Sequence, residues 1–83
     1  MKVRYFAWMK RTVGVSEEEL SPPADIATVG DLVIWLRTRS PGHAEALAEG
    51  AAFGAAVDQR TATFDAKLAG AREVAFFPPF TGG

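Results

Sequence analysis

The sequence predicts a single α+β domain in which one mixed β-sheet packs against one main helix. The chain has 83 residues, which is enough for one domain. An alternating pattern near the N-terminus indicates a strand, and residues 29–36 carry the apolar spacing of an amphipathic helix. Short apolar runs bounded by glycine and proline follow, as is typical of further strands.

The composition excludes several classes of function. Nine Lys and Arg against ten Asp and Glu give a net charge of −1, so we expect no nucleic-acid binding. The chain has no cysteine and a single histidine, His43, so we expect no disulfide and no metal site. No signal-peptide pattern and no membrane-length apolar run occurs, so we expect a cytoplasmic protein that does not bind membranes.

The first predicted strand is the alternating run over residues 2–8. Period-two spacing places Val3 and Tyr5 on the face that packs against the helix. The same spacing places Phe6 and Trp8 on the opposite, open face of the sheet.

Gly14 separates this strand from a second, acidic one over residues 17–20. We expect a solvated edge strand, in which alternation places Glu18 and Leu20 on one face. Residues 21–23 include two prolines, which have no N–H to donate to a ladder, so this segment is a connection.

The clearest predicted element is a helix that begins after Thr28. Thr28 is a good N-cap, and Asp31 three residues later completes a shortened capping box. Residues 40–42, Ser-Pro-Gly, end the helix. Apolar residues at i, i+3, i+4 and i+7 form one stripe, which consists of Val29, Leu32, Val33 and Leu36.

Residues 43–52 are rich in alanine and glutamate and predict a short second helix or helical turn. Ser40 and His43 are three residues apart, but Pro41-Gly42 between them marks a helix end. We therefore expect His43 to be a solvated loop residue and not part of a catalytic pair.

The remaining elements are short strands. Gly54 precedes a strand of small residues over 55–57, and residues 58–60 turn the chain into a strand over 61–64. The last strand covers residues 73–77 and is stopped by two prolines. Two strands, a helix, a short helix and three strands on this scale suggest a β-grasp (ubiquitin-like) fold.

The C-terminal residues carry the chemical hypothesis. We assign residues 1–79 to a single β-grasp domain and residues 80–83 to a flexible reactive tail. Pro78-Pro79 hold the backbone extended, and Gly82-Gly83 have no Cβ atoms, so they can pass through a channel too narrow for side chains. Four extended residues reach about 13 Å, which is enough to deliver a carboxylate into the active site of another protein.

The chemistry open to the carboxylate of Gly83 is acyl activation. A free carboxylate is a poor electrophile, and adenylation gives it a good leaving group. The sequence contains no glycine-rich phosphate-binding motif, so an ATP-binding partner would have to carry out that step. The chain itself is not expected to be a self-sufficient enzyme.

An aromatic patch on the open face is the second functional signal. Phe6, Trp8 and Phe77 are predicted to lie together there, next to the root of the tail, and such patches are commonly interaction sites. We assign partner binding to Phe6, Trp8, Thr61, Phe77, Pro78 and Pro79. We assign Phe80, Thr81 and Gly82 to threading of the tail.

These residues resemble one family along the whole chain. The matching segments are Val3-Arg4-Tyr5-Phe6-Ala7, Thr28-Val29-Gly30-Asp31-Leu32, Ala56-Val57-Asp58 and Glu73-Val74-Ala75-Phe76-Phe77-Pro78-Pro79 followed by Gly82-Gly83. The chain resembles the small subunit of molybdopterin synthase, the MoaD family of ubiquitin-like sulfur carriers. The departures are Asp58, where the family usually has Asn, and residues 69–72, where it has an acidic turn; neither affects the tail.

The resemblance implies a mechanism and a set of partners. A MoeB-like enzyme uses ATP and Mg²⁺ to adenylate Gly83, and a sulfur donor protein converts it to a thiocarboxylate. The tail then enters a MoaE-like large subunit, where two sulfur transfers to cyclic pyranopterin monophosphate build the dithiolene of molybdopterin. The chain would be the non-catalytic, sulfur-carrying small subunit of a heterotetramer and would bind no cofactor itself.

Three alternatives remain open. A sulfur carrier for another pathway, such as the thiamin-pathway protein ThiS, would share the fold, but that family usually lacks the element over residues 76–79. A ubiquitin-like modifier would form isopeptide bonds with lysines of target proteins. A plain interaction domain would not need Gly83.

Overall fold

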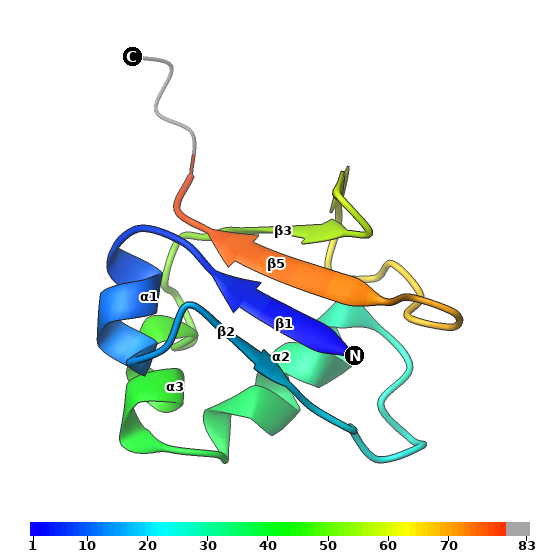
Figure 1. Cartoon of the computed structure of the whole chain (residues 1–83), viewed down its shortest axis with the longest axis horizontal. Coiled ribbons are helices and arrows are strands. Elements are labelled where there is room, and N and C mark those ends of the chain that lie inside the picture. The colour runs from blue at the N-terminus through cyan, green and yellow to red at the C-terminus, as the bar shows by residue number, and fades with distance from the viewer. Residues whose placement is uncertain (80–83) are drawn as a thin grey trace.

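The computed structural model describes residues 1–79, and residues 80–83 lie outside the described part (Figure 1). In chain order the elements are β1 (Lys2–Tyr5), α1 (Trp8–Val13), β2 (Glu17–Glu19), α2 (Val29–Arg37), α3 (Pro41–Ala46), β3 (Gly54–Val57), β4 (Arg60–Ala62) and β5 (Glu73–Phe77).

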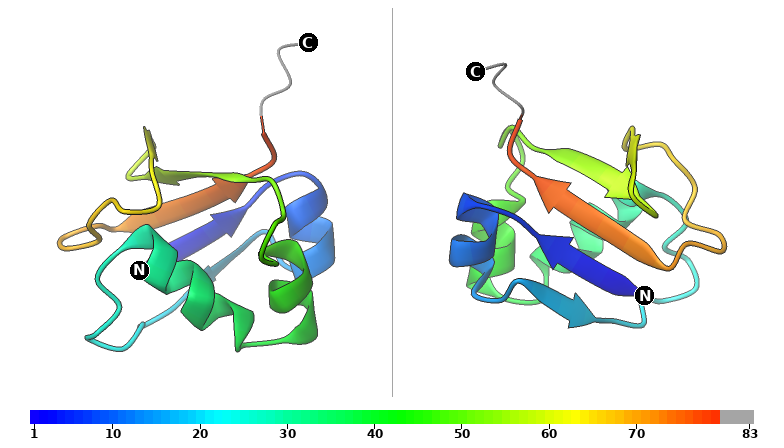
Figure 2. Two further views of the ribbon diagram at one scale, coloured as in Figure 1. Left: turned by 180° about the vertical axis from the view of Figure 1, so that it is seen from behind. Right: turned by 45° about the horizontal axis from the view of Figure 1, so that its top comes forward.

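The strands of residues 1–79 form one mixed sheet in the order β2-β1-β5-β3-β4. β1 and β5 are parallel, and the other neighbouring strands are antiparallel. Seen from behind in Figure 2, α2 lies in front of the strands and α3 lies beside it. The predicted class, a mixed sheet packed on one main helix, is confirmed.

The main helix α2 forms for the reasons that the sequence predicts. Thr28 Oγ1 accepts from the Asp31 N–H at 3.1 Å, and Asp31 Oδ2 accepts from the Thr28 N–H at 3.2 Å, which completes the capping box. The helix ends at Arg37, a few residues earlier than expected. The whole predicted stripe is buried, namely Val29, Leu32, Val33 and Leu36.

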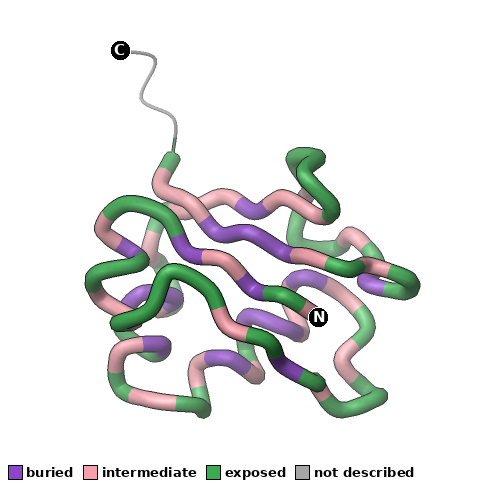
Figure 3. The backbone as a smooth tube through the Cα atoms, viewed as in Figure 1, coloured by how far each residue is buried: buried purple, intermediate pink, exposed green. Residues whose placement is uncertain are grey.

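The core lies between this helix and the two central strands. Figure 3 shows buried residues along β1, β5 and α2. Tyr5 and Phe76, in register on β1 and β5, stack with ring centroids 6.3 Å apart. Phe53 meets Phe76 edge-on at 5.9 Å. β5, which leads directly to the tail, is therefore held at the centre of the core.

The prediction that the first strand runs to Trp8 is wrong. β1 ends at Tyr5, Ala7 takes a positive φ of 54°, and Trp8 begins α1, which the sequence analysis missed. Met9 is fully buried, so the turn into α1 covers one end of the core. Gly14, with φ 103°, ends α1 in the left-handed conformation that glycine tolerates.

Candidate functional site

The open face of the sheet, which points away from α2, is defined by alternation along β5. Val74 and Phe76 are fully buried in the core, so Glu73, Ala75 and Phe77 point to the open face as predicted. Ala75 is only 7% exposed, yet it does not belong to the core cluster.

One half of the open face is charged. Lys2 Nζ lies 3.5 Å from a Glu17 carboxylate oxygen, and Arg4 Nε lies 3.8 Å from the other. Arg4 Nη1 lies 3.9 Å from Glu73 Oε1. Lys2, Arg4 and Glu17 have well-exposed side chains and only Glu73 is mostly buried, so each pair contributes roughly 0–1 kcal/mol to stability and the main effect is to orient Arg4.

The other half, at the end of β5, is apolar. The Phe6 N–H donates to the Phe76 carbonyl at 3.1 Å, which holds Phe6 beside the end of β5. Phe6 is 39% exposed, and the Arg4 guanidinium lies 5.0 Å from the centre of its ring. Phe77 and Pro78 are half-buried and Pro79 is exposed. We call Phe6, Phe77, Pro78 and Pro79 the tail-root patch.

The other two predicted interface residues lie elsewhere. Trp8 does not share a strand face with Phe6, because it begins α1 and packs partly against the core. Thr61 is exposed at the centre of β4, paired with Ala56, which is itself paired with Ala75 on β5. Thr61 therefore faces the open side, two strands away from β5. The binding roles of these residues stay predictions.

The predicted reactive residues lie outside the described part of the chain. Gly83, as the activated residue, and Phe80, Thr81 and Gly82, as the threading segment, follow directly after Pro79.

Gly54 has a place in the site that the sequence analysis missed, because the sequence predicts it only as a strand boundary. It is the register partner of Phe77 across β3 and β5.

A buried polar network lies beside β2, at the edge of the sheet away from β4. It corrects the prediction for His43. That residue is 7% exposed, with Nε2 2.7 Å from Glu18 Oε2 and Nδ1 2.7 Å from Ser40 Oγ. The Tyr5 hydroxyl donates to the same Glu18 oxygen at 2.7 Å. His43 is buried because α3 packs closely on α1: a Cβ at Gly42 would lie 2.5 Å from the Thr12 carbonyl oxygen.

The network shifts the pKa of two of its members. Burial would raise the pKa of the Glu18 carboxyl, but hydrogen bonds from His43 and Tyr5 outweigh it and hold that pKa below its ordinary value. Arg39 adds a favourable charge interaction. Burial, followed by the hydrogen bond to Glu18, raises the pKa of Tyr5. The network is thus most stable with Glu18 ionised and Tyr5 protonated.

Glu18→Gln is expected to lower the free energy of unfolding at about pH 7 by about 1.5–3 kcal/mol, the range for hydrogen bonds to a charged group. Because the folded pKa of Glu18 lies below its ordinary value of 4.5, its contribution is full above that value and is lost as the pH falls through the folded pKa. Urea unfolding measured from about pH 7 down to below pH 4.5 should show that the difference in free energy of unfolding between wild type and Glu18→Gln becomes smaller in acid. Glu45→Gln, at an exposed residue of α3, is the matched control. A difference in free energy of unfolding that does not change with pH would contradict this account.

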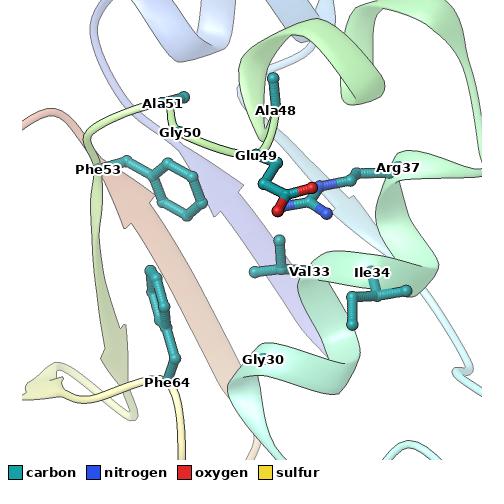
Figure 4. Close-up of a pocket in the computed structure, with 10 residues that line it drawn as sticks. All are labelled: Gly30, Val33, Ile34, Arg37, Ala48, Glu49, Gly50, Ala51, Phe53 and Phe64. Atoms are coloured by element: carbon teal, nitrogen blue, oxygen red, sulfur yellow. The ribbon is translucent and has the colours of Figure 1, made fainter.

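A hollow of about 380 Å³ lies on the helix side, between α2 and the segment before β3 (Figure 4). Val33, Phe53 and Phe64 line it together with Arg37, whose Nε donates to the Leu47 carbonyl at 2.6 Å. None of the described site candidates lines it. Within residues 1–79, no group of three or more His, Cys, Asp or Glu side chains is placed to bind a metal. No helix in the same span is long and apolar enough to cross a membrane.

Two solved structures share this architecture closely. SAMP1 from Haloferax volcanii superposes with a TM-score of 0.74 at 25% identity, and the match covers 100% of this chain and 98% of the SAMP1 chain. A putative molybdopterin converting factor, subunit 1, from Pyrococcus furiosus has a TM-score of 0.71 at 30% identity, covering 94% of each chain. The fold and its open face define a ubiquitin-like β-grasp protein, as predicted.

Sequence comparison identifies the family. The model of the ThiS family matches residues 3–83, and the chain belongs to this family. Over 83 residues it is 41% identical to the molybdopterin synthase sulfur carrier subunit of Escherichia coli (strain K12), covering 100% of this chain and 99% of that relative. The resemblance to the MoaD family is thereby confirmed.

Proposed function

We propose that the protein is the sulfur carrier subunit of a molybdopterin synthase. The observation that carries this proposal is the 41% identity to a sulfur carrier subunit of that enzyme over the full chain. The segment Glu73–Phe77 supports it, because β5 anchors Phe76 in the core and leaves Phe77 on the open face directly before the Pro78-Pro79 root.

The chemistry assigned to this chain is that of a carried acyl group. The carboxylate of Gly83 attacks the α-phosphorus of ATP on a MoeB-like enzyme, forming an acyl-adenylate and releasing pyrophosphate. A sulfur donor protein then supplies the sulfur that replaces AMP, which leaves a thiocarboxylate. We assign ATP and Mg²⁺ to the partner, because this sequence contains no glycine-rich phosphate-binding motif.

We assign the open face of the sheet to binding a MoaE-like large subunit, which receives the sulfur. The tail-root patch, with Thr61, would dock on that subunit while Phe80, Thr81 and Gly82 thread toward its active site. There the thiocarboxylate sulfur bonds to cyclic pyranopterin monophosphate, and water then cleaves the acyl carbon–sulfur bond, which leaves the sulfur on the pterin and returns Gly83 to a carboxylate. Two such transfers build the dithiolene. We place the complex in the cytoplasm.

Reconstitution tests this function. The protein is incubated with a MoeB-like enzyme, ATP, Mg²⁺ and a sulfur donor, and then with a MoaE-like subunit and cyclic pyranopterin monophosphate. Molybdopterin should form, detected as its fluorescent oxidised derivative. Sulfur incorporation into a thiazole by thiamin-pathway enzymes alone would favour the ThiS-like alternative. Higher-mass ladders in a lysate supplied with ATP would favour a lysine-conjugated modifier.

The two adjacent phenylalanines of β5 give matched tests of the interface. Phe77→Ala is expected to weaken binding to the MoaE-like subunit by about 1–3 kcal/mol, as for an aromatic interface anchor, with little loss of stability. Phe76→Ala, at a fully buried core position, should instead lower the free energy of unfolding by about 3–5 kcal/mol. Titration calorimetry and thermal melts separate the two effects. Equal destabilisation by both variants, with unchanged affinity, would overturn the assignment of faces.

A further inference from the structure

Gly54 is a glycine that the backbone does not require. Gly14, Gly50 and Gly70 have φ values of 103°, 87° and 78°, in the region that favours glycine. Gly54 has no such positive φ, since it begins β3 in an ordinary strand conformation. Glycine weakens a strand and commonly marks a place where another group approaches the backbone closely.

The group that approaches Gly54 is the ring of Phe77. A Cβ atom at Gly54 would lie 2.6 Å from Cε1, 3.0 Å from Cζ and 3.4 Å from Cδ1 of that ring. The two residues are register partners on antiparallel strands, and both belong to the open face. The preceding residue, Phe53, points the other way and meets Phe76 in the core. The ring therefore occupies the space where any other residue would place a side chain.

We propose that Gly54 is a positioning residue that holds the ring of Phe77 down over β3 and so gives the tail-root patch the shape that the MoaE-like subunit contacts. This inference rests on the proposed function, since it takes Phe77 to lie in that interface. Phe77 is the last residue of β5, and Pro78 follows at once, so the ring lies where the chain leaves the sheet.

Adding one methyl group tests this geometry. In Gly54→Ala the methyl and the ring cannot occupy the same space, and the ring is the end of a flexible side chain, so it swings away while the backbone stays. The variant should fold with unchanged or slightly higher stability, since alanine loses less conformational freedom on folding than glycine. Its affinity for the MoaE-like subunit should fall at least fivefold.

A readout without the partner checks the contact itself. In the free wild-type protein, the α protons of Gly54 should show nuclear Overhauser effects to the ring protons of Phe77. In Gly54→Ala the effects between residue 54 and that ring should weaken, while those between Phe53 and Phe76 persist. Loss of both sets of nuclear Overhauser effects would mean that β3 has moved. That result would overturn the positioning role of Gly54.

The deciding experiment measures affinity for the MoaE-like subunit in wild type, Gly54→Ala, Phe77→Ala and the double variant. Because Gly54 acts through the ring, Gly54→Ala should weaken binding in the wild type and have no further effect once Phe77 is alanine. Ala44→Ser, which adds one atom at an exposed residue of α3 away from the open face, should bind like the wild type.

The outcomes separate the two claims. If Phe77→Ala binds like the wild type, the proposed interface is wrong. If Phe77→Ala binds weakly but Gly54→Ala binds like the wild type, the interface stands and the positioning role is overturned. A loss of the same size from Gly54→Ala in both backgrounds also overturns it, because residue 54 would then act without the ring.

Discussion

Removing Gly83 is expected to abolish sulfur transfer and to leave the folded domain unchanged. The proposed chemistry takes place at the carboxylate of Gly83, and ending the chain at Gly82 withdraws the reactive carbon by one residue, or roughly 3.3 Å. The domain should not respond, because its stability comes from the core that α2 packs against β1 and β5. Molybdopterin formation and the thermal midpoint are the two measurements.

A variant lengthened by one alanine after Gly83 is the matched control. It keeps every native residue and displaces only the carboxylate, so it should melt like the wild type and also fail to transfer sulfur. Full activity of either variant would show that the acyl group is not carried at Gly83. A large fall in the midpoint would show that the terminal residues belong to the folded unit.

Gly82→Ala is expected to fold normally and to lose at least about a hundredfold in the rate of sulfur transfer. In a close-fitting channel the added methyl meets atoms already at contact distance, which costs roughly 1–3 kcal/mol. Displacing the reacting carbon by about 1 Å costs a further factor of order a hundred in rate. Binding to the MoaE-like subunit should fall less, because the tail-root patch still docks.

Single-turnover conversion of the pterin precursor by thiocarboxylated wild type and variant measures this effect without the activation step. Ser21→Thr, which also adds one methyl group but at an exposed residue of the connection before α2, is the control and should keep the full rate. Equal rates for Gly82→Ala and wild type would mean that the channel is not tight at this position. The glycine pair would then serve flexibility or the activating enzyme.

Features set by local sequence could be predicted. The capping residues Thr28 and Asp31 and the apolar stripe after them lie within nine residues, so they identify α2 without knowledge of the rest of the fold. The strand Glu73–Phe77 was predicted with its bounds and faces, because alternation and two following prolines are also local signals. The position of Phe77 on the open face, directly before the two prolines, follows from the second of these elements.

Features set by contacts between distant segments could not be predicted. Alternation over residues 2–8 fits a strand, yet Met9 is buried by a turn into α1 that depends on the positive φ of Ala7. His43 is buried only because α3 packs on α1 and brings its ring to Glu18, 25 residues away in the sequence. The role of Gly54 needs the cross-strand register with Phe77.

The most direct test of the sulfur-carrier account is the mass of the protein after incubation with a MoeB-like enzyme, ATP, Mg²⁺ and a sulfur donor. The intact mass should rise by the difference between one sulfur and one oxygen atom, and tandem mass spectrometry should place the change on Gly83. The gain should be absent when ATP is omitted. No gain in the complete reaction, or a modification at any other residue, would contradict the account.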